Sequence, residues 1–221
     1  GDKSDLKDIV DIVQLAYDTI KQEAKVLSIM INKVPEENVN VLKQSLIERT
    51  NNTTDVTVIP SIKSLSSPTI KEIVQILQGE VLFGNDMLNN LTENFSVGAM
   101  QLRNYLTHLK DNALVITPGD RADIILGALQ AHSSKNYPKI SGIVLTGGLI
   151  PEEPILKLIE GLSSIVPIIS VNGGTYSVTN SIGTIKSRIY SDNIEKITTS
   201  IATFEKHIDT DKLADKLITF E

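Results

Sequence analysis

Three short apolar runs in the second half of the chain each end in a turn of small residues and are followed by a helical pattern. The runs are 113–117, 140–146 and 167–171, and the turns are Pro118-Gly119, Gly147-Gly148 and Asn172-Gly173-Gly174. A repeated order of strand, turn and helix builds a mainly parallel sheet, because each helix carries the chain back to the start of the next strand. This repeat limits the chain to an α/β fold.

The rest of the chain extends the same alternation. Apolar runs predict further strands at 25–32, 55–59 and 80–83. Helical spacing predicts helices at 5–24, 38–49, 68–78, 96–109, 121–132, 154–162, 175–182, 192–204 and 211–219. Ser67 is the expected N-cap of the third helix, with Pro68 at its first position. We therefore expect mostly parallel sheets flanked by helices, in three layers.

Apolar periodicity lapses between Phe83 and Leu91, where asparagine becomes frequent. We place the domain junction there, so that the chain divides into sub-domains of residues 1–84 and 85–221.

Composition excludes several classes of function. The 221 residues carry a net charge of −6, which argues against nucleic acid or an anionic membrane as the main partner. The chain has no cysteine, so disulfides, thiol catalysis and cysteine-ligated metals are excluded. Its three histidines stand apart in the sequence, and neither H-x-x-x-H nor G-x-S-x-G occurs. We therefore assign no metal, no cofactor and no catalytic residue.

The sequence also bears on location. No run approaches the roughly 18 apolar residues of a membrane span, and the first residues do not form a signal peptide. We expect a soluble, cytoplasmic chain without a membrane partner. The leading Gly1 is typical of a cloning remnant, which favours an expressed piece of a longer protein.

Asp120 and Arg121 follow the first of the three runs, where a strand ends and a helix begins. Ligands of open α/β sheets bind at the carboxyl ends of strands, and arginine can hold a carboxylate or a phosphate with two hydrogen bonds. The alternative is structural. In that case Asp120 caps the helix and pairs with Arg121 or with a neighbouring subunit.

Thr146, Gly147 and Gly148 follow the second run and allow the same two interpretations. Their backbone amides could bind an anion, or the glycines could serve only to turn the chain sharply out of a buried strand.

The third run is followed by Asn172, two glycines, Thr175 and Tyr176. Thr175 is an expected helix cap. Tyr176 could stack on a ligand or contact a second subunit. We therefore treat all eight of these residues as candidates for a ligand site or an interface: Asp120, Arg121, Thr146, Gly147, Gly148, Asn172, Thr175 and Tyr176.

Several stretches, in this order, resemble phosphate acetyltransferases. The run L-V-I-T-P-G-D-R-A-D from Leu114, the T-G-G at 146–148 and N-G-G-T-Y at 172–176 are similar to the DRTGG domain of that family. Asp120 and Arg121 match the first two residues of the domain's motif, and Ala122-Asp123 depart from it. The stretches V-L-S-I-M-I-N-K-V-P at 26–35, V-I-P-S-I at 58–62 and E-V-L-F-G at 80–84 resemble the second half of a dethiobiotin-synthetase-like P-loop domain.

The resemblance implies a parent enzyme that converts acetyl-CoA and phosphate to acetyl phosphate and CoA. It implies that residues 1–84 are a P-loop-like half without the P-loop, since G-x-x-x-x-G-K-[ST] occurs nowhere in the sequence. Residues 85–221 would be the DRTGG domain. The implied role is regulation and assembly, with a homodimer formed through the loops around Asp120, Thr146 and Thr175. The implied partners are a C-terminal acetyltransferase domain and a small-molecule effector.

Two other functions remain open at this stage. One is a stand-alone DRTGG module that senses a metabolite or an adenine nucleotide. The other is an ATP-dependent ligase similar to dethiobiotin synthetase, against which the missing P-loop counts.

Overall fold

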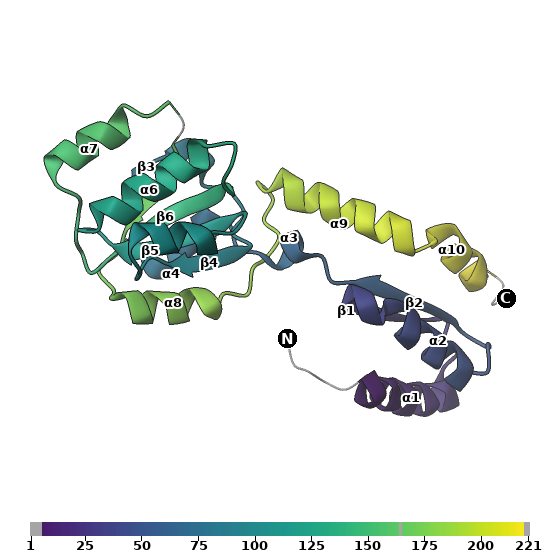
Figure 1. The fold of residues 1–221 in the computed structure, drawn as a ribbon. Helices are drawn as coiled ribbons and strands as arrows, with labels where there is room; N and C mark the ends of the chain where they lie inside the picture. Colours follow the sequence, from purple (N-terminus) through teal and green to yellow (C-terminus); the bar gives the residue numbers. More distant parts are fainter. Residues whose placement is uncertain (1–5, 164, 219–221) are drawn as a thin grey trace. The chain divides into compact units, whose positions relative to one another are not determined.

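The computed structural model describes residues 6–163 and 165–218. They form two compact units (Figure 1). The first contains the residues up to Ile62 together with those from Ile194 on, and the second is Lys63–Asn193. The boundaries between the units lie after Ile62 and after Asn193, not near residue 84 as predicted. The reason is that the predicted strand at 80–83 pairs within the second unit.

The first unit is built on a two-stranded parallel sheet. It contains α1 (Leu6–Glu23), β1 (Ser28–Val34), a 3-10 turn (Glu36–Asn38), α2 (Val39–Arg49), β2 (Asp55–Pro60), α9 (Ile194–His207) and α10 (Thr210–Ile218). β1 pairs with β2 in the register Ser28↔Asp55. Among the described residues neither strand has a second partner, so each keeps one open edge. The predicted helix at 211–219 is present, although its last residue lies outside the described residues.

One face of this small sheet carries the core of the unit. Val56 and Val58 on β2 pack with Val10 on α1 and with Leu42 and Leu46 on α2. Because side chains alternate along a strand, the β2 residues that alternate with Val56 and Val58 lie on the other face of the sheet. That face lies towards the C-terminal helices α9 and α10 (Figure 1).

The second unit is a three-layer α/β domain. Its strands are β3 (Glu80–Phe83), β4 (Asn94–Val97), β5 (Ala113–Pro118), β6 (Ile140–Thr146) and β7 (Ile168–Ser170), in the order β3-β7-β6-β5-β4. All neighbours are parallel except β3 and β7. Its helices are α3 (Lys63–Ser66), α4 (Ile70–Leu77), α5 (Leu102–Tyr105), α6 (Ala122–Ser133), α7 (Glu153–Glu160) and α8 (Thr175–Gly183), with 3-10 turns at Asn85–Met87 and Leu106–His108. The expected α/β architecture with mainly parallel sheets is confirmed.

Both faces of the central strands are buried. Val115, Ile143 and Leu145 pack under α6 and α7. Leu114, Ile116 and Val144, which alternate with them, pack under α4 and α8. Figure 1 shows these two pairs of helices on opposite sides of the sheet.

One predicted helix is wrong. Instead of a helix over 96–109, the chain forms strand β4 and then two short helical turns. Phe95 and Val97 alternate with polar residues, and β4 finds backbone partners along β5. That parallel ladder is a tertiary interaction, and it outweighs the helical spacing of the apolar residues.

The N-cap of α4 also differs from the expectation. Thr69, not Ser67, caps this helix. The Thr69 side chain accepts the N–H of Glu72 at 3.2 Å, while the Glu72 carboxylate accepts the N–H of Thr69 at 2.9 Å. This reciprocal capping box satisfies two helix-end donors at once, which a cap at Ser67 would not achieve.

His132 makes the stability of the second unit depend on pH. Its Nδ1 accepts the N–H of Ile140 at 3.2 Å, and burial, followed by the charge of Lys139, lowers the pKa of the ring. The folded state therefore favours neutral His132, whereas the unfolded chain binds a proton near pH 6.5. The stabilisation is fully present above that pH and is lost as pH falls from about 6.5 towards the lower folded pKa.

We expect His132→Gln to have a flatter dependence of unfolding free energy on pH than the wild type between pH 7.5 and 5.5. Urea titrations across this range measure it. Equal slopes for wild type and His132→Gln would contradict the assignment.

Candidate functional site

The turns after β5, β6 and β7 meet at one edge of the five-stranded sheet. The N–H of Gly119 donates to the carbonyl of Thr146 at 3.4 Å. A Cβ on Gly119 would lie only 1.9 Å from the carbonyl oxygen of Leu149, so the first turn packs directly against the second. The turns after β5 and β6 therefore lie in contact at this edge of the sheet.

Gly147 and Gly148 shape the second turn. Their φ angles are +82° and +66°, a region that favours glycine. The N–H of Gly147 donates to the carbonyl of Gly173, and the N–H of Gly148 donates to that of Val171, both at 2.9 Å. Since both amides have partners within the domain, they are not available to an anion. The geometry supports the conformational interpretation of these glycines.

Thr146 and Thr175 join the second turn to the third. Their hydroxyl oxygens are 2.9 Å apart, and Thr146 is almost fully buried. The expectation that Thr175 caps α8 is wrong. Gly174 occupies the cap position and has no side chain to offer, while the Thr175 hydroxyl bonds to Thr146.

Arg121 holds the loop after β4 against the start of α6. Its guanidinium donates to both carboxylate oxygens of Asp123, at 2.8 and 2.9 Å. It also donates to the carbonyls of Gly98 and Met100, at 3.3 and 2.9 Å. The hydrogen bond to Asp123 is the main cause that raises the pKa of Arg121. Arg121 therefore pairs with Asp123 and not, as the structural alternative expected, with Asp120. Asp120 is also not the cap residue of α6, a position that Arg121 occupies.

The remaining candidates lie on the surface of the same edge. Asp120 and Asn172 are exposed, and Tyr176 is 81% exposed. Met100, Leu149 and Ile150, in the neighbouring loops after β4 and β6, are also exposed apolar residues. The edge therefore combines a rigid, internally bonded base with apolar side chains in solvent. This arrangement suits an interface better than a pocket.

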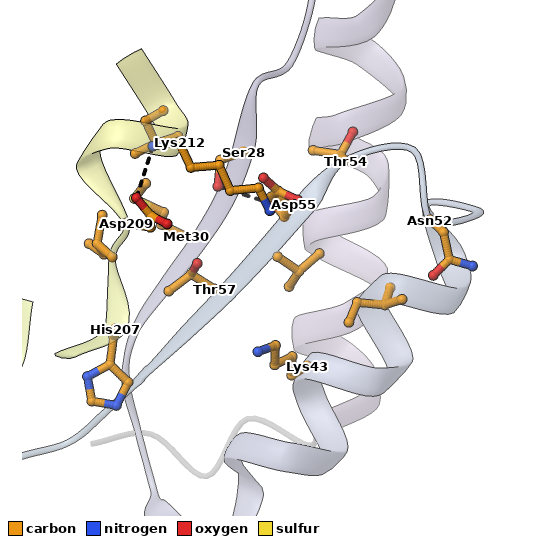
Figure 2. Close-up of a pocket in the computed structure, with 14 residues that line it drawn as sticks. Ser28, Met30, Lys43, Asn52, Thr54, Asp55, Thr57, His207, Asp209 and Lys212 are labelled. Carbon is orange, nitrogen blue, oxygen red and sulfur yellow. Dashed lines mark hydrogen bonds and ion pairs between the residues drawn. The ribbon is translucent and has the colours of Figure 1, made fainter. Parts of the chain in front are cut away.

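Sequence reasoning missed a second site, in the first unit. A pocket of about 410 Å³ lies on the polar face of the β1–β2 sheet, beside the α9–α10 turn (Figure 2). Asp55 anchors α10 there, accepting hydrogen bonds from Lys212 at 3.1 Å and from Lys216 at 2.5 Å. The hydrogen bonds to Lys216 and then Lys212 lower the pKa of Asp55.

Two lysines of α10 are thus bonded to the sheet and not only to solvent. Lys212 and Lys216 are four residues apart and share one face of α10. That spacing was the available signal, but it did not identify Asp55 as the partner.

Two further observations concern the residues that the structure describes. In 6–163 and 165–218, no three histidine or carboxylate side chains gather into a group that could hold a metal ion. Of the helices in these ranges, none combines the length and hydropathy needed to cross a bilayer.

Comparison with known proteins points to one family. A model of the "DRTGG domain" matches residues 72–185, within the second unit. The phosphate acetyltransferase of Nitratidesulfovibrio vulgaris is 36% identical over 224 residues, which cover 99% of this chain and 32% of that protein. That of Synechocystis sp. is 37% identical over 217 residues, covering 97% of this chain and 31% of that protein. The chain thus spans about a third of the length of these curated relatives.

Among solved structures, the chain is similar to the CBS and DRTGG domains of the regulatory region of Clostridium perfringens pyrophosphatase, complexed with the activator diadenosine tetraphosphate. The TM-score is 0.45 and the identity 15%, over 81% of this chain and 88% of that one. The match of the family model over more than half of the residues decides the assignment. The chain therefore belongs to the DRTGG domain family.

Proposed function

We propose that this chain is the non-catalytic regulatory and assembly region of a phosphate acetyltransferase. The observation that carries the proposal is the similarity to two such enzymes over 97–99% of the chain. The whole protein would convert acetyl-CoA and phosphate to acetyl phosphate and CoA. In that protein, this region would join a C-terminal acetyltransferase domain and respond to a small-molecule effector. The part of the first unit up to Ile62 would derive from a P-loop-like half without its phosphate-binding loop.

The assembly role rests on the sheet edge where the three turns meet. Hydrogen bonds between the turns fix their backbone, so little conformational freedom is lost when a partner binds. Tyr176 and Leu149 project from this base into solvent, at 81% and 42% exposure. Exposed aromatic and apolar residues on a rigid base are typical of the centres of protein interfaces. We propose that two copies of the chain associate through this edge.

Tyr176→Ser is expected to weaken the dimer about tenfold or more, because a buried interface tyrosine commonly contributes at least ~2 kcal/mol. Light-scattering mass measured over a range of protein concentrations gives the dissociation constant. Tyr137→Ser is the matched control, since Tyr137 is also an exposed tyrosine and lies before β6, away from the turns. A wild-type chain that stays monomeric at high micromolar concentration would refute the assembly role.

The regulatory role is tested by the same mass measurement and by thermal unfolding, with acetyl-CoA, phosphate, pyruvate, NADH and ATP added in turn. A ligand that binds the native state raises the unfolding temperature by mass action. A shift with one of these compounds would support regulation. A dimer that responds to none of them would leave assembly as the only role.

A further inference from the structure

The pocket in the first unit has the construction of a small-molecule site. Ser28, Met30 and Thr57 on the strands form its base, and Lys43 on α2 lines one side. The α9–α10 turn lines the other side and contributes His207 (Figure 2). The volume of about 410 Å³ falls in the usual range of ligand pockets, roughly 300–1,000 Å³. Met30 and Ile47 provide apolar wall among the polar groups.

The two carboxylates of the pocket already have partners. Asp55 accepts from Lys212 and Lys216, and Asp209 accepts the backbone N–H of Lys212 at 2.9 Å at the start of α10. Of the two lysines that line the pocket, Lys43 and Lys212, Lys212 is paired with Asp55.

Lys43 is the lining lysine without an ion-pair partner among the described residues. None of the ion pairs or hydrogen bonds found among the described residues involves its amine, although the side chain lines the pocket. Figure 2 shows the amine extending from α2 towards the strands and the α9–α10 turn. An ammonium group provides three donors and no acceptor, so its natural partner is an anion.

His207 faces the same space from the end of α9. Its Nδ1 lies 2.8 Å from the carbonyl oxygen of Thr203. A carbonyl can only accept, so Nδ1 carries the proton, and Nε2 is left as an acceptor that a hydroxyl group of a ligand can meet. The Thr57 hydroxyl provides a further polar group at the base of the pocket (Figure 2).

We propose that this pocket binds a small anion, a carboxylate or a phosphate, with Lys43 as its counter-ion, the Thr57 hydroxyl as a donor to it, and His207 Nε2 as the acceptor for an O–H group of the ligand. The site deepens the proposed regulatory function and rests on it, since it would be the place where an effector binds. An anion there would contact both the β1–β2 sheet and the α9–α10 turn. Binding would therefore strengthen the attachment of α10, which Asp55 provides through Lys212 and Lys216.

The test is calorimetric titration of the chain with inorganic phosphate and with malonate, at constant ionic strength. Neutral malonamide is the chemical control. We expect one or both anions to bind, and malonamide not to bind. Lys43→Gln keeps the length of the side chain but removes its charge, and should weaken binding about tenfold or more. Lys33→Gln is the matched control, because Lys33 is an exposed lysine of the same unit outside the pocket.

A second measurement gives a structural readout. Hydrogen exchange of the amides of α10 should slow when the anion is bound, and should not change in Lys43→Gln. His207→Ala provides an independent variant, for which weaker binding of phosphate is expected, because the O–H group of hydrogen phosphate can donate to Nε2.

Three results would overturn the site: no binding of either anion by the wild type, equal loss of affinity in Lys33→Gln, or unchanged affinity in Lys43→Gln. The mass of the chain separates this inference from the proposed function. A dimer that binds neither anion refutes the pocket alone, whereas a monomer that binds one refutes the assembly role alone.

Discussion

Gly119→Ala is expected to lower the free energy of unfolding of the second unit by about 3 kcal/mol, at the upper end of the usual cost of overpacking. The added Cβ would lie 1.9 Å from the carbonyl oxygen of Leu149 and 2.5 Å from its carbonyl carbon. The obstacle is backbone, so no side chain can rotate to make room. The turn after β6 must move instead, and the bonds from Gly147 and Gly148 to the third turn are then strained.

The measurement is hydrogen exchange of the β5 and β6 amides in the full chain as a function of denaturant, because these strands form the centre of the second unit. Gly183→Ala is the matched control. A Cβ at Gly183 meets nothing within 4 Å, and the residue ends helix α8. Alanine is a better helix former than glycine, so this control should be neutral or slightly stabilising. If the β5 and β6 amides were equally protected from exchange in Gly119→Ala and Gly183→Ala, the turns at this edge would not be rigidly packed.

Glu72→Ala is expected to cost about 3 kcal/mol, because it leaves several donors without their acceptor. Glu72 is only 5% exposed. Its carboxylate accepts the N–H of Thr69 at 2.9 Å, the hydroxyl of Ser187 at 2.9 and 3.0 Å, and the N–H of Arg188 at 3.1 Å. One buried side chain thus caps α4 and fixes the segment that follows α8.

Glu72→Gln should fall between the wild type and Glu72→Ala, because it keeps one acceptor oxygen but loses the charge. Glu160→Ala is the control: Glu160 is exposed on α7, and such changes usually stay within ~0.5 kcal/mol. Chemical denaturation of the three variants and the wild type measures the differences. A Glu72→Ala variant as stable as the Glu160→Ala control would contradict the role of this carboxylate.

The same edge of the second unit shows what could be predicted about the candidate site. The turns after β5, β6 and β7 were identified from their small residues, and their convergence follows from a parallel sheet, whose strands all end at one edge. The bonding within the turns was not predictable. Arg121 pairs with Asp123 two positions away, and Thr175 bonds to Thr146 across 29 residues. Which of several near neighbours a polar side chain selects depends on distances that only the folded backbone sets.

The pocket of the first unit could not be predicted from the sequence either, because its residues are distant from one another in the chain. It brings Lys43 together with His207, which follows 164 positions later in the chain. Neither residue lies in a recognisable motif, and both types are common on surfaces. The spacing of Lys212 and Lys216 indicated a shared helix face, but not the strand residue that this face would meet.

The sequence by itself determined the α/β class, most of the helices and the strands in the core of the second unit. These depend on apolar spacing, on glycine and on proline, which act within a few residues. Tertiary structure decided that 94–97 is a strand, that β3 runs antiparallel beside β7, and that Thr69 rather than Ser67 caps α4. The physical reason is that a strand at the edge of a sheet, or a polar side chain with several possible partners, is stabilised by groups distant in sequence. Local patterning carries no information about those groups.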